Sequence, residues 1–483
     1  MIELDKVTYT YPFQEQPAVR DISLCVKPGE AVLVTGASGC GKSTLVRLIN
    51  GLCPHFFQGR LEGGIRRNRE SGRNKTLREI SAAVGTVFQD PELQFFALNV
   101  ADELAFAHEW QGKSRQEIQR IVDETALRLG ITHILSASIH DLSEGQKQKV
   151  ALGTVLSMKP GIVVLDEPSA NLDPESTAEL AGIIQELKRR GLAVVVADHR
   201  LYWLEGTADR VLVMHRGGIA AQGNFDMLAD SDLRKAYGLR RHRVADVRQT
   251  LEPLPEKGAI EMTDLTFAHK RGPVLYENAG FCLPRGVTGI IGGNGTGKTT
   301  LARLLTGLTR MKQGKITVDG KSVSPRRLLK RSGLVLQNTD HQLHMNSVVR
   351  ELAMASGLGP SGKNSREKLL SNLDRFGLKH LARRHPQSLS GGEKQRLVIA
   401  CGLAPGPDIL ILDEPTSGLD GYNMKRIARM IRRAGDDGVS VVVITHDLEL
   451  LAEVCDTALR LPFPGAVSHP GTYPVSPGET RRI

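Results

Sequence analysis

Residues 36–43 read Gly36-Ala-Ser-Gly-Cys-Gly-Lys42-Ser43, and residues 292–299 read Gly292-Gly-Asn-Gly-Thr-Gly-Lys298-Thr299. Both stretches fit the pattern G-x-x-x-x-G-K-[ST], and each follows a short apolar run that predicts a strand, residues 31–34 or 287–291. Glycines let backbone N–H groups close around phosphate oxygens, and the N-terminus of a following helix adds a positive dipole. The sequence therefore predicts two phosphate-binding loops, each between a strand and a helix.

The chemistry of these loops points to a nucleotide with a bound magnesium ion. Lys42 and Lys298 would reach the β- and γ-phosphates, while Ser43 and Thr299 would hold Mg²⁺, the one cofactor expected. The residues expected to bind ATP in the loops are Gly36, Ala37, Ser38, Gly39, Cys40, Gly41, Lys42, Ser43 and Thr44, and Gly292, Gly293, Asn294, Gly295, Thr296, Gly297, Lys298, Thr299 and Thr300.

The two loops belong to an internal repeat. The distance from Ser143 to Ser390 is 247 residues, and later motifs keep the same spacing. A chain of 483 residues is long enough for two or more domains. We expect a first domain over residues 1–238, a linker over 239–258, a second domain over 259–462 and an irregular tail over 463–483.

Secondary structure in each half is expected to alternate between strand and helix. Four apolar runs, at 162–165, 193–197, 409–412 and 441–444, are short and rich in β-branched residues, as in strands buried on both faces of a parallel sheet. Residues 175–190 and 422–434 are expected to be helical. The fold class is therefore α/β.

Composition limits the class of protein. With 40% hydrophobic and 24% charged residues, it is ordinary for a globular domain, and no apolar run approaches the roughly 20 residues that span a bilayer. The start of the chain lacks a signal sequence, so a cytoplasmic protein is expected. Six cysteines without a C-x-x-C pair indicate neither a disulfide framework nor a zinc site.

The net charge of +10 allows two interpretations. One is attraction to nucleic acid or to an anionic membrane surface. The other is a solvated surface with surplus arginine. The basic residues are mostly dispersed, which favours the second interpretation, and no nucleic-acid partner is expected.

Paired carboxylates follow one predicted strand in each half. Asp166-Glu167-Pro168 comes after Ile162-Val-Val-Leu, and Asp413-Glu414-Pro415 comes after Ile409-Leu-Ile-Leu. A carboxylate at the end of a buried strand, beside a phosphate loop, is suited to holding Mg²⁺ through water. The next carboxylate can polarise an attacking water as a general base. Asp166 and Asp413 are thus candidate metal ligands, and Glu167 and Glu414 are candidate catalytic bases.

A further motif lies upstream of each acidic pair, Leu142-Ser143-Glu144-Gly145-Gln146 in the first half and Leu389-Ser390-Gly391-Gly392-Glu393 in the second. Here the chain resembles the ABC ATPases, whose signature is Leu-Ser-Gly-Gly-Gln, over almost its whole length. The resemblance implies two tandem P-loop nucleotide-binding domains, each with a mostly parallel sheet core, an antiparallel β part and a helical signature subdomain. It also implies head-to-tail sites, in which Ser390 and Gly392 complete the first and Ser143 and Gly145 complete the second.

Other positions match the family as well. Gln89 and Gln337 are similar to the glutamine that senses Mg²⁺ and the γ-phosphate. His199 and His446 follow the last apolar strands and resemble the switch histidine that bonds the γ-phosphate, so we class them as catalytic. Tyr11 stands where the family often has an aromatic ring stacked on adenine.

Three departures from the family pattern stand out. His269 occupies the position that matches Tyr11, which makes stacking in the second site less certain. Glu393 replaces the signature glutamine. Glu144 replaces a signature glycine and brings negative charge near a phosphate, which should weaken binding unless the carboxylate points outward or is paired. Because no catalytic carboxylate or switch histidine is lost, we expect two competent sites.

The segment after each sensing glutamine suggests the partner. Residues 89–96 read Gln-Asp-Pro-Glu-Leu-Gln-Phe-Phe, and residues 337–343 read Gln-Asn-Thr-Asp-His-Gln-Leu. Both resemble the energy-coupling factor ATPases, which serve the uptake of vitamins, such as a thiamine precursor, or of transition metals. The resemblance implies integral membrane partners, a scaffold and a substrate-binding subunit, and a peripheral location at the cytoplasmic face of the cell membrane.

In that family, this stretch receives coupling helices from the scaffold, so docking is expected around residues 94–96 and 342–343. Leu98, Val100 and Leu104 are equally well explained as core residues. Two alternatives to the importer remain. One is a soluble tandem factor acting on the ribosome, which would need a long charged helical linker. The other is a tandem sugar-importer ATPase, which tends to have one degenerate site.

Overall fold

The computed structural model describes residues 1–68, 70–71, 75–269, 274–359 and 363–463. They form two compact units: the first holds residues 1–244 and 418–422, and the second holds the other described residues. The tail expected over residues 463–483 lies, apart from Phe463, outside the described residues. Within the described part of the chain, no helix has both the length and the apolar character to cross a membrane.

A mostly parallel sheet forms the centre of the first unit. Its strands are β3 (Ala31–Gly36), β6 (Val84–Val87), β7 (Ile162–Asp166), β8 (Ala193–Ala197), β9 (Arg210–His215) and β10 (Gly218–Gly223). They lie in the order β10-β9-β3-β8-β7-β6, and only β10 pairs antiparallel with its neighbour. Strands β3 and β8 are buried along their whole length, which agrees with a sheet covered on both faces.

A smaller antiparallel sheet covers one side of the first unit. It consists of β1 (Ile2–Thr10), β2 (Val19–Val26), β4 (Arg60–Arg67) and β5 (Glu70–Ser71), in the order β2-β1-β4-β5. One apolar core joins this sheet, helix α1 (Lys42–Ile49) and one face of the central sheet. Helix α1 is therefore held directly after β3, at the end of the first phosphate loop.

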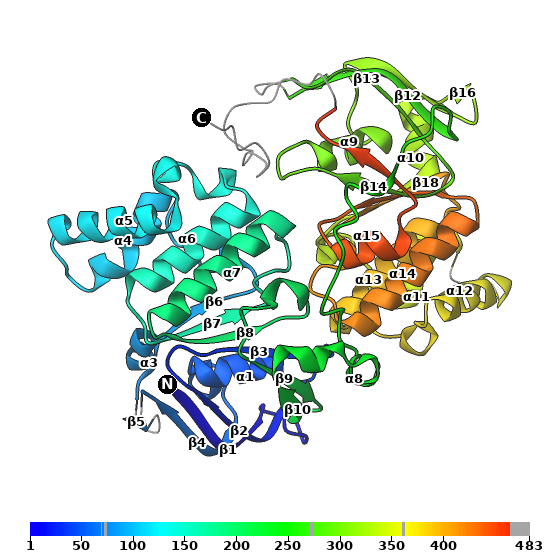
Figure 1. Ribbon diagram of the computed structural model, residues 1–483. Coiled ribbons are helices and arrows are strands. Elements are labelled where there is room, and N and C mark those ends of the chain that lie inside the picture. Colours follow the sequence, from blue (N-terminus) through cyan, green and yellow to red (C-terminus); the bar gives the residue numbers. More distant parts are fainter. Residues whose placement is uncertain (69, 72–74, 270–273, 360–362, 464–483) are drawn as a thin grey trace. The chain divides into compact units, whose positions relative to one another are not determined.

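Helices cover the other face of the central sheet (Figure 1). The four longest are α4 (Val100–Trp110), α5 (Arg115–Leu129), α6 (Glu144–Ser157) and α7 (Pro174–Arg189), and they share one apolar core with β3, β7 and β8. The shorter helices of the first unit are α2 (Leu52–His55), α3 (Leu77–Ala83), α8 (Ser231–Tyr237), η1 (Pro91–Gln94), η2 (Thr132–Ile134), η3 (Ile139–Asp141), η4 (Tyr202–Leu204) and η5 (Phe225–Ala229), of which α2 and α3 pack into the core on the side of the antiparallel sheet. The helix expected over residues 175–190 is confirmed as α7.

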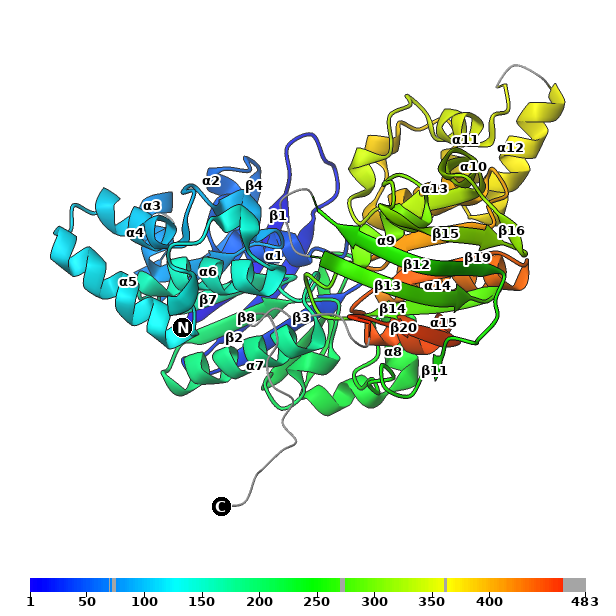
Figure 2. The ribbon, with the colours of Figure 1, turned by 90° about the horizontal axis from the view of Figure 1, so that it is seen from above.

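The second unit repeats this plan. Its central sheet contains β11 (Glu252–Pro253), β14 (Gly286–Ile291), β17 (Ser332–Val335), β18 (Ile409–Asp413), β19 (Ser440–Ile444) and β20 (Thr457–Arg460), in the order β11-β20-β14-β19-β18-β17. Its antiparallel sheet, visible in Figure 2, contains β12 (Ile260–Ala268), β13 (Val274–Leu283), β15 (Gln313–Val318) and β16 (Lys321–Ser322). The α/β fold expected from the sequence is confirmed in both units.

The remaining helices follow the same order as in the first half. They are α9 (Lys298–Leu305), α10 (Pro325–Arg331), α11 (Val348–Ser356), α12 (Lys363–Arg375), α13 (Gly391–Leu403), α14 (Gly421–Asp436) and α15 (Leu448–Val454), with the short turns η6 (Thr339–His341), η7 (Lys379–Leu381) and η8 (Pro386–Ser388). Helix α9 lies in an apolar core with the antiparallel sheet and β18, as α1 does in the first unit.

The two central sheets differ at one edge. In the first unit, the chain turns back after β9 and adds β10 antiparallel to it. In the second unit, the matching strand β20 pairs in parallel with β11, which comes from the region expected to be a linker. The Arg460 guanidinium also donates hydrogen bonds to the carbonyls of Arg248 and Leu251, at 2.9 and 2.8 Å. The connecting segment therefore completes the second sheet.

Candidate nucleotide-binding sites

The first phosphate loop joins β3 to α1, as the sequence predicts. Its glycines Gly36, Gly39 and Gly41 all have positive φ, between 76° and 147°, where a side chain would be strained. A Cβ on Gly36 would also lie 2.3 Å from the carbonyl oxygen of Met214. The Lys42 ammonium group folds back over the loop and donates to the carbonyls of Gly36 and Ala37, at 3.0 and 3.4 Å. The loop thus forms a tight backbone cradle with a lysine at its mouth.

The second loop has the same construction between β14 and α9. The Lys298 ammonium group donates to the carbonyls of Gly292 and Gly293, at 2.7 and 2.9 Å. Thr296 takes the place of Cys40, and its hydroxyl donates to the Gly293 carbonyl at 2.9 Å. Both lysines therefore occupy equivalent positions.

The first acidic pair lies beside the first loop, at the end of β7. Burial raises the pKa of Asp166 to about 6 and the pKa of Glu167 to about 8, against the opposing charge of Lys42. The Gln89 amide donates to Glu167 Oε2 at 2.9 Å, and His199 Nε2 lies 3.4 Å from Glu167 Oε1. The predicted lysine, carboxylates, glutamine and histidine thus converge at one site.

Backbone geometry and burial set the orientation of this group. Glu167 has a φ of 47°, and its N–H donates to the carbonyl of Ala197 on the neighbouring strand β8 at 2.7 Å. A positive φ in a non-glycine residue is uncommon and often marks a functional position. Burial lowers the pKa of His199 well below its usual value, so the imidazole is neutral near pH 7.

The second acidic pair has the same placement at the end of β18. The Thr299 hydroxyl donates to Asp413 Oδ2 at 3.2 Å, and burial raises the pKa of Asp413. Glu414 has a φ of 46° and accepts from the His446 N–H at 2.9 Å. The His446 ring nitrogen Nε2 lies 3.1 Å from Oδ1 of Asn294 in the second loop. Gln337 follows β17 as Gln89 follows β6.

One buried residue that differs between the two sites was not predicted from the sequence. In the second site, the Thr445 hydroxyl donates to Glu414 Oε2 at 2.8 Å. The matching residue in the first site is Asp198, which is buried and whose charge helps to raise the pKa of Glu167. The signal was available, because Asp198 and Thr445 each directly precede the switch histidine at the repeat spacing.

The residues expected to hold magnesium fit a cation. Asp166 Oδ1 is buried and has no hydrogen-bond partner among the described residues, which leaves an oxygen free for a ligand. In the second site, the Asp413 carboxylate already lies beside the Thr299 hydroxyl, and oxygen donors of these two kinds suit Mg²⁺. Ser43, Thr299, Asp166, Asp413, Gln89 and Gln337 thus remain the candidate metal residues.

The signature serines both cap helices. Ser143 is the N-cap of α6, with the Gln146 side chain accepting from its N–H at 2.9 Å. Ser390 is the N-cap of α13, and the Glu393 carboxylate accepts the equivalent bond at 2.8 Å. The replacement of glutamine by Glu393 therefore preserves the cap, since both side chains offer an oxygen.

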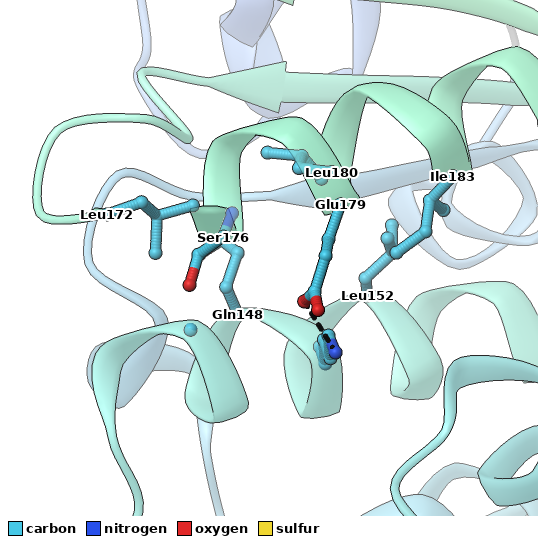
Figure 3. Close-up of a pocket in the computed structure, with 9 residues that line it drawn as sticks. Gln148, Leu152, Leu172, Ser176, Glu179, Leu180 and Ile183 are labelled. Atoms are coloured by element: carbon cyan, nitrogen blue, oxygen red, sulfur yellow. Dashed lines mark ion pairs between the residues drawn. The ribbon is translucent and has the colours of Figure 1, made fainter. Parts of the chain in front are cut away.

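The signature glycines Gly145 and Gly392 lie where two helices approach closely. A Cβ on Gly145 would lie 2.6 Å from the hydroxyl oxygen of Ser176 on α7, and one on Gly392 would lie 2.4 Å from Cγ of Asn423 on α14. A small pocket between α6 and α7 is lined by Gln148, Ser176 and Glu179 among others (Figure 3). Both glycines, which are expected to bind ATP, thus let two helices approach closely, and the approach is tighter at Gly392 than at Gly145.

The carboxylate of Glu144, which departs from the signature, is paired. It lies 2.9 Å from the ammonium group of Lys147, one turn later on α6. The carboxylate is therefore paired, with a lysine that it shares with Glu92, and pairing is the condition under which it need not weaken phosphate binding.

Tyr11 packs beside α1. Its hydroxyl accepts from Arg47 at 3.0 Å and lies 3.2 Å from the Thr44 hydroxyl, and its ring meets Phe57 edge to face. His269 is exposed, and its ring meets the edge of Phe267, with no hydrogen bond to the ring found among the described residues. An aromatic ring is thus fixed beside α1 in the first unit, whereas the imidazole at the matching position of the second unit is exposed.

The turn after each sensing glutamine is closed by a second glutamine. Gln94 Oε1 accepts from the Phe88 N–H at 3.0 Å, and Gln342 Oε1 accepts from the Leu336 N–H at 2.8 Å. We call residues 88–94 and 336–342 the glutamine turns. The buried carboxylate of Glu103 accepts from the N–H groups of residues 96 and 97, both at 2.8 Å, and so fixes the segment that follows.

The expectation that a partner docks around residues 94–96 and 342–343 needs correction. Leu343 is only 5% exposed and is closed to a partner, whereas Phe95 is partly buried against the core and offers less surface than Phe96. Phe96 is 76% exposed and stacks on Phe106, which in turn meets Trp110 edge to face. We call Phe96, Phe106 and Trp110 the aromatic surface. Phe95 and Phe96 differ because neighbouring side chains of an extended segment point to opposite sides, so only one of two adjacent residues faces the core.

Burial decides whether Leu98, Val100 and Leu104 are core residues or could contact a partner. Val100 and Leu104 are fully buried in the core, whereas Leu98 is 75% exposed. The second half has no equivalent of the aromatic surface, since His344, Met354 and Leu358 stand 248 residues after Phe96, Phe106 and Trp110.

The sequence profile described as ABC transporter matches residues 19–170 and 276–417, which together exceed half of the chain. The chain belongs to the ABC transporter ATPase family. Each matched range holds one phosphate loop and one acidic pair, so the family's ATPase domain is present twice.

Full-length relatives agree. A Treponema denticola protein, provisionally named an ABC transporter ATP-binding protein, is 38% identical over 95% of this chain and 95% of its own length. A Bacillus subtilis protein, provisionally named an HMP/thiamine import ATP-binding protein, is 32% identical over 95% of this chain and 90% of its own.

A solved tandem ABC structure shows the same fold. The archaeal ribosome recycling factor aABCE1, in complex with the ribosomal stalk protein aP1, has a TM-score of 0.61 with 21% identity, over 94% of this chain and 87% of that one. At this identity, the likeness concerns the fold alone.

Proposed function

We propose that this chain is the ATP-hydrolysing subunit of an importer of the energy-coupling factor type, for a vitamin such as a thiamine precursor or for a transition metal ion. The observation that carries the proposal is that each half places a phosphate loop, an acidic pair and a switch histidine together. Family membership supports ATP hydrolysis, and the Bacillus subtilis relative supports the class of substrate.

The chemistry assigns a role to each side chain. Lys42 and Lys298 exchange their bonds to loop carbonyls for bonds to the β- and γ-phosphates. Glu167 and Glu414, in their ionised forms, accept a proton from the attacking water. Their position at the end of a buried strand orients the carboxylate towards the loop, and the positive φ of both residues sets that direction.

The residues around these bases complete the proposal. His199 and His446 would donate to the γ-phosphate, and Gln89 and Gln337 would report its presence. Bound magnesium would neutralise phosphate charge, held by Ser43, Asp166 and Gln89 in the first site and by Thr299, Asp413 and Gln337 in the second.

In the proposed working arrangement, the two halves complete each other's sites. Ser390 and Gly392 would face the nucleotide at the first loop, and Ser143 and Gly145 the nucleotide at the second. The N-termini of α6 and α13 favour negative charge through exposed N–H groups and the helix dipole. Because neither half has lost a lysine, base or histidine, we expect both sites to hydrolyse ATP.

We further propose that the aromatic surface receives a short helix from the membrane scaffold, with the chain bound peripherally at the cytoplasmic face of the membrane. Aromatic side chains are favoured anchors at protein interfaces. Phe96 lies two residues beyond the first glutamine turn, and its backbone is fixed by Glu103. A partner bound there would thus sense the turn that contacts Glu167 through Gln89.

The connection between the halves argues against a factor acting on the ribosome. The described residues from 239 to 258 contain no helix and instead supply strand β11. A long charged helical linker, which that alternative requires, is absent from this stretch. The intact catalytic groups in both halves likewise argue against the sugar-importer alternative with one degenerate site.

Membrane fractionation tests the proposal. A tagged chain expressed in its own cells should sediment with membranes and copurify with small hydrophobic proteins, and the purified complex should hydrolyse ATP. Recovery only with ribosomes, or only as a free protein without ATPase activity, would refute it.

A further inference from the structure

Lys147, in the first turn of α6, is a buried lysine with two carboxylate partners. Its ammonium group lies 2.9 Å from Glu144 and also contacts Glu92 on η1, inside the first glutamine turn. Only 8% of its side chain is exposed. A buried ammonium group requires such partners, since an unpaired charge away from water is strongly unfavourable. The pairing therefore fixes the glutamine turn against the beginning of α6.

Lys394 makes the same connection in the second unit. Its ammonium group lies 2.7 Å from Asp340 on η6, inside the second glutamine turn, and donates to the Gln387 side chain at 2.9 Å. Asp340 follows Gln337 by three residues, as Glu92 follows Gln89. The same contact is thus built twice, although the carboxylate side chain differs in length.

Hydrogen bonds close each glutamine turn around its acidic residue, Glu92 in the first and Asp340 in the second. In the first, Asp90 accepts from the Glu92 N–H at 3.1 Å, and Gln94 accepts from the Phe88 N–H. In the second, Asn338 accepts from the Asp340 N–H at 3.0 Å. A turn closed in this way moves as a unit, so a displacement of its sensing glutamine displaces the carboxylate that binds the lysine.

The other end of the connection is the signature serine. Lys147 is four residues after Ser143, whose hydroxyl accepts from the Gln146 N–H at 3.3 Å. Lys394 has the same relation to Ser390. Each lysine thus lies one helical turn from its signature serine, so a displacement of the lysine also displaces the start of the signature helix.

We propose that Lys147 and Lys394 are positioning residues that make each glutamine turn and its signature serine move together. The inference rests on the proposed function, in which Gln89 senses nucleotide at the first loop while Ser143 contacts nucleotide at the second. Occupancy of one site then sets the position of the serine offered to the other. The two lysines would therefore carry cooperativity between the ATP sites, a coupling that is typically worth about 5- to 150-fold in affinity.

The two lysines differ in the partner that each would keep if its glutamine turn moved away. Lys147 keeps a second carboxylate, Glu144, whereas the other partner of Lys394 among the described residues is the amide oxygen of Gln387. A carboxylate is the stronger partner for an ammonium group. The first connection therefore releases more easily, which gives the unusual Glu144 a role. Replacement of Glu144 by glycine, the residue at the matching position 391, should make the first connection hold as firmly as the second.

The test uses the full chain with Lys147→Met or Lys394→Met, changes that keep length and remove charge. Binding of a fluorescent ATP analogue and steady-state hydrolysis are measured across ATP concentration. We expect the first ATP to bind within about 2-fold of its wild-type affinity and the second to bind about 5- to 150-fold more weakly, with a lower kcat and a Hill coefficient that falls from above 1 to about 1.

Lys149→Met is the matched control. Lys149 lies on the same helix and pairs with Glu179 on α7 at 2.7 Å, the contact drawn dashed in Figure 3; among the described residues, it makes no ion pair with the glutamine turn. It should retain the kcat and Hill coefficient of the wild type. An equal loss in this control would overturn the inference, because any charge on α6 would then have the same effect.

A reversed pair separates positioning from simple loss of structure. Lys394→Glu should lose cooperativity, and the double variant Lys394→Glu with Asp340→Lys should recover it. Folded variants that show no recovery, or a Lys147→Met protein with unchanged kcat and Hill coefficient, would overturn the inference alone. A wild-type chain that neither binds nor hydrolyses ATP would overturn the proposed function as well, so the two failures are distinguishable.

Discussion

Gly392→Ala should destabilise the second unit by an amount that the packing predicts. The added Cβ would lie 2.4 Å from Cγ and 2.5 Å from Oδ1 of Asn423. Overpacking of this kind costs about 1–3 kcal/mol. The Asn423 side chain must move, and its Oδ1 accepts from buried Arg396 at 2.8 Å, a bond to a charged group worth about 1.5–3 kcal/mol.

Replacing glycine by alanine in a helix returns about 1 kcal/mol. The central values leave a net loss of about 3 kcal/mol, which in a unit of this size lowers the melting temperature by about 6–12 °C. Gly145→Ala is the internal control, because its Cβ meets only the small Ser176 side chain, which can rotate. That variant should be neutral or slightly stabilising.

Calorimetry of the full chain, with hydrogen exchange of peptides from α13 to assign the transition, measures both variants. Adding Asn423→Ala removes the clash, so Gly392→Ala should cost almost nothing in that background. The reasoning is refuted if Gly392→Ala alone leaves the second transition unmoved, or if its cost persists unchanged after Asn423 is truncated.

The remaining predictions concern activity and partners. Lys42→Ala and Lys298→Ala should each weaken nucleotide binding at one loop by about 10-fold or more, through loss of a charged phosphate partner; calorimetric titration that finds wild-type affinity in the double variant would contradict this. Glu167→Gln and Glu414→Gln should each slow hydrolysis at their own site by about 10²–10⁴-fold with ATP binding intact, and unchanged turnover in the double variant would exclude these bases. Phe96→Ala should keep fold and ATP binding but lose copurification with membrane subunits, whereas retention of the complex would remove the aromatic surface from the interface.

Much of the fold could be predicted because the motifs report local structure. The aliphatic runs before Asp166 and Asp413 became β7 and β18 almost to the residue. A run of four β-branched or leucine residues next to a glycine loop has few alternatives to a buried parallel strand. Because the same motifs recur in the second half, each prediction made for the first half also applied to the second.

The features that could not be predicted from the sequence depend on tertiary contacts. Nothing in the spacing of Glu92 and Lys147 shows that they meet, because 55 residues separate them and the contact forms only when η1 packs on α6. The choice between Phe95 and Phe96 depends on which side of an extended segment faces the core. The exchange of Asp198 for Thr445 was visible, but its effect on Glu167 required knowledge of burial.

Strand β11 has a consequence for how the protein is made. It leaves the ribosome roughly 200 residues before β20, the strand it pairs with, so the second sheet stays incomplete until β20 has been synthesised. A fragment that starts after Pro253 would carry a permanently open sheet edge, which invites association with other chains. One that starts at Ala245 would carry its own closing strand. The two halves are therefore unequal as products of gene duplication: the earlier copy closes its own edge, whereas the later copy depends on the segment that joins them.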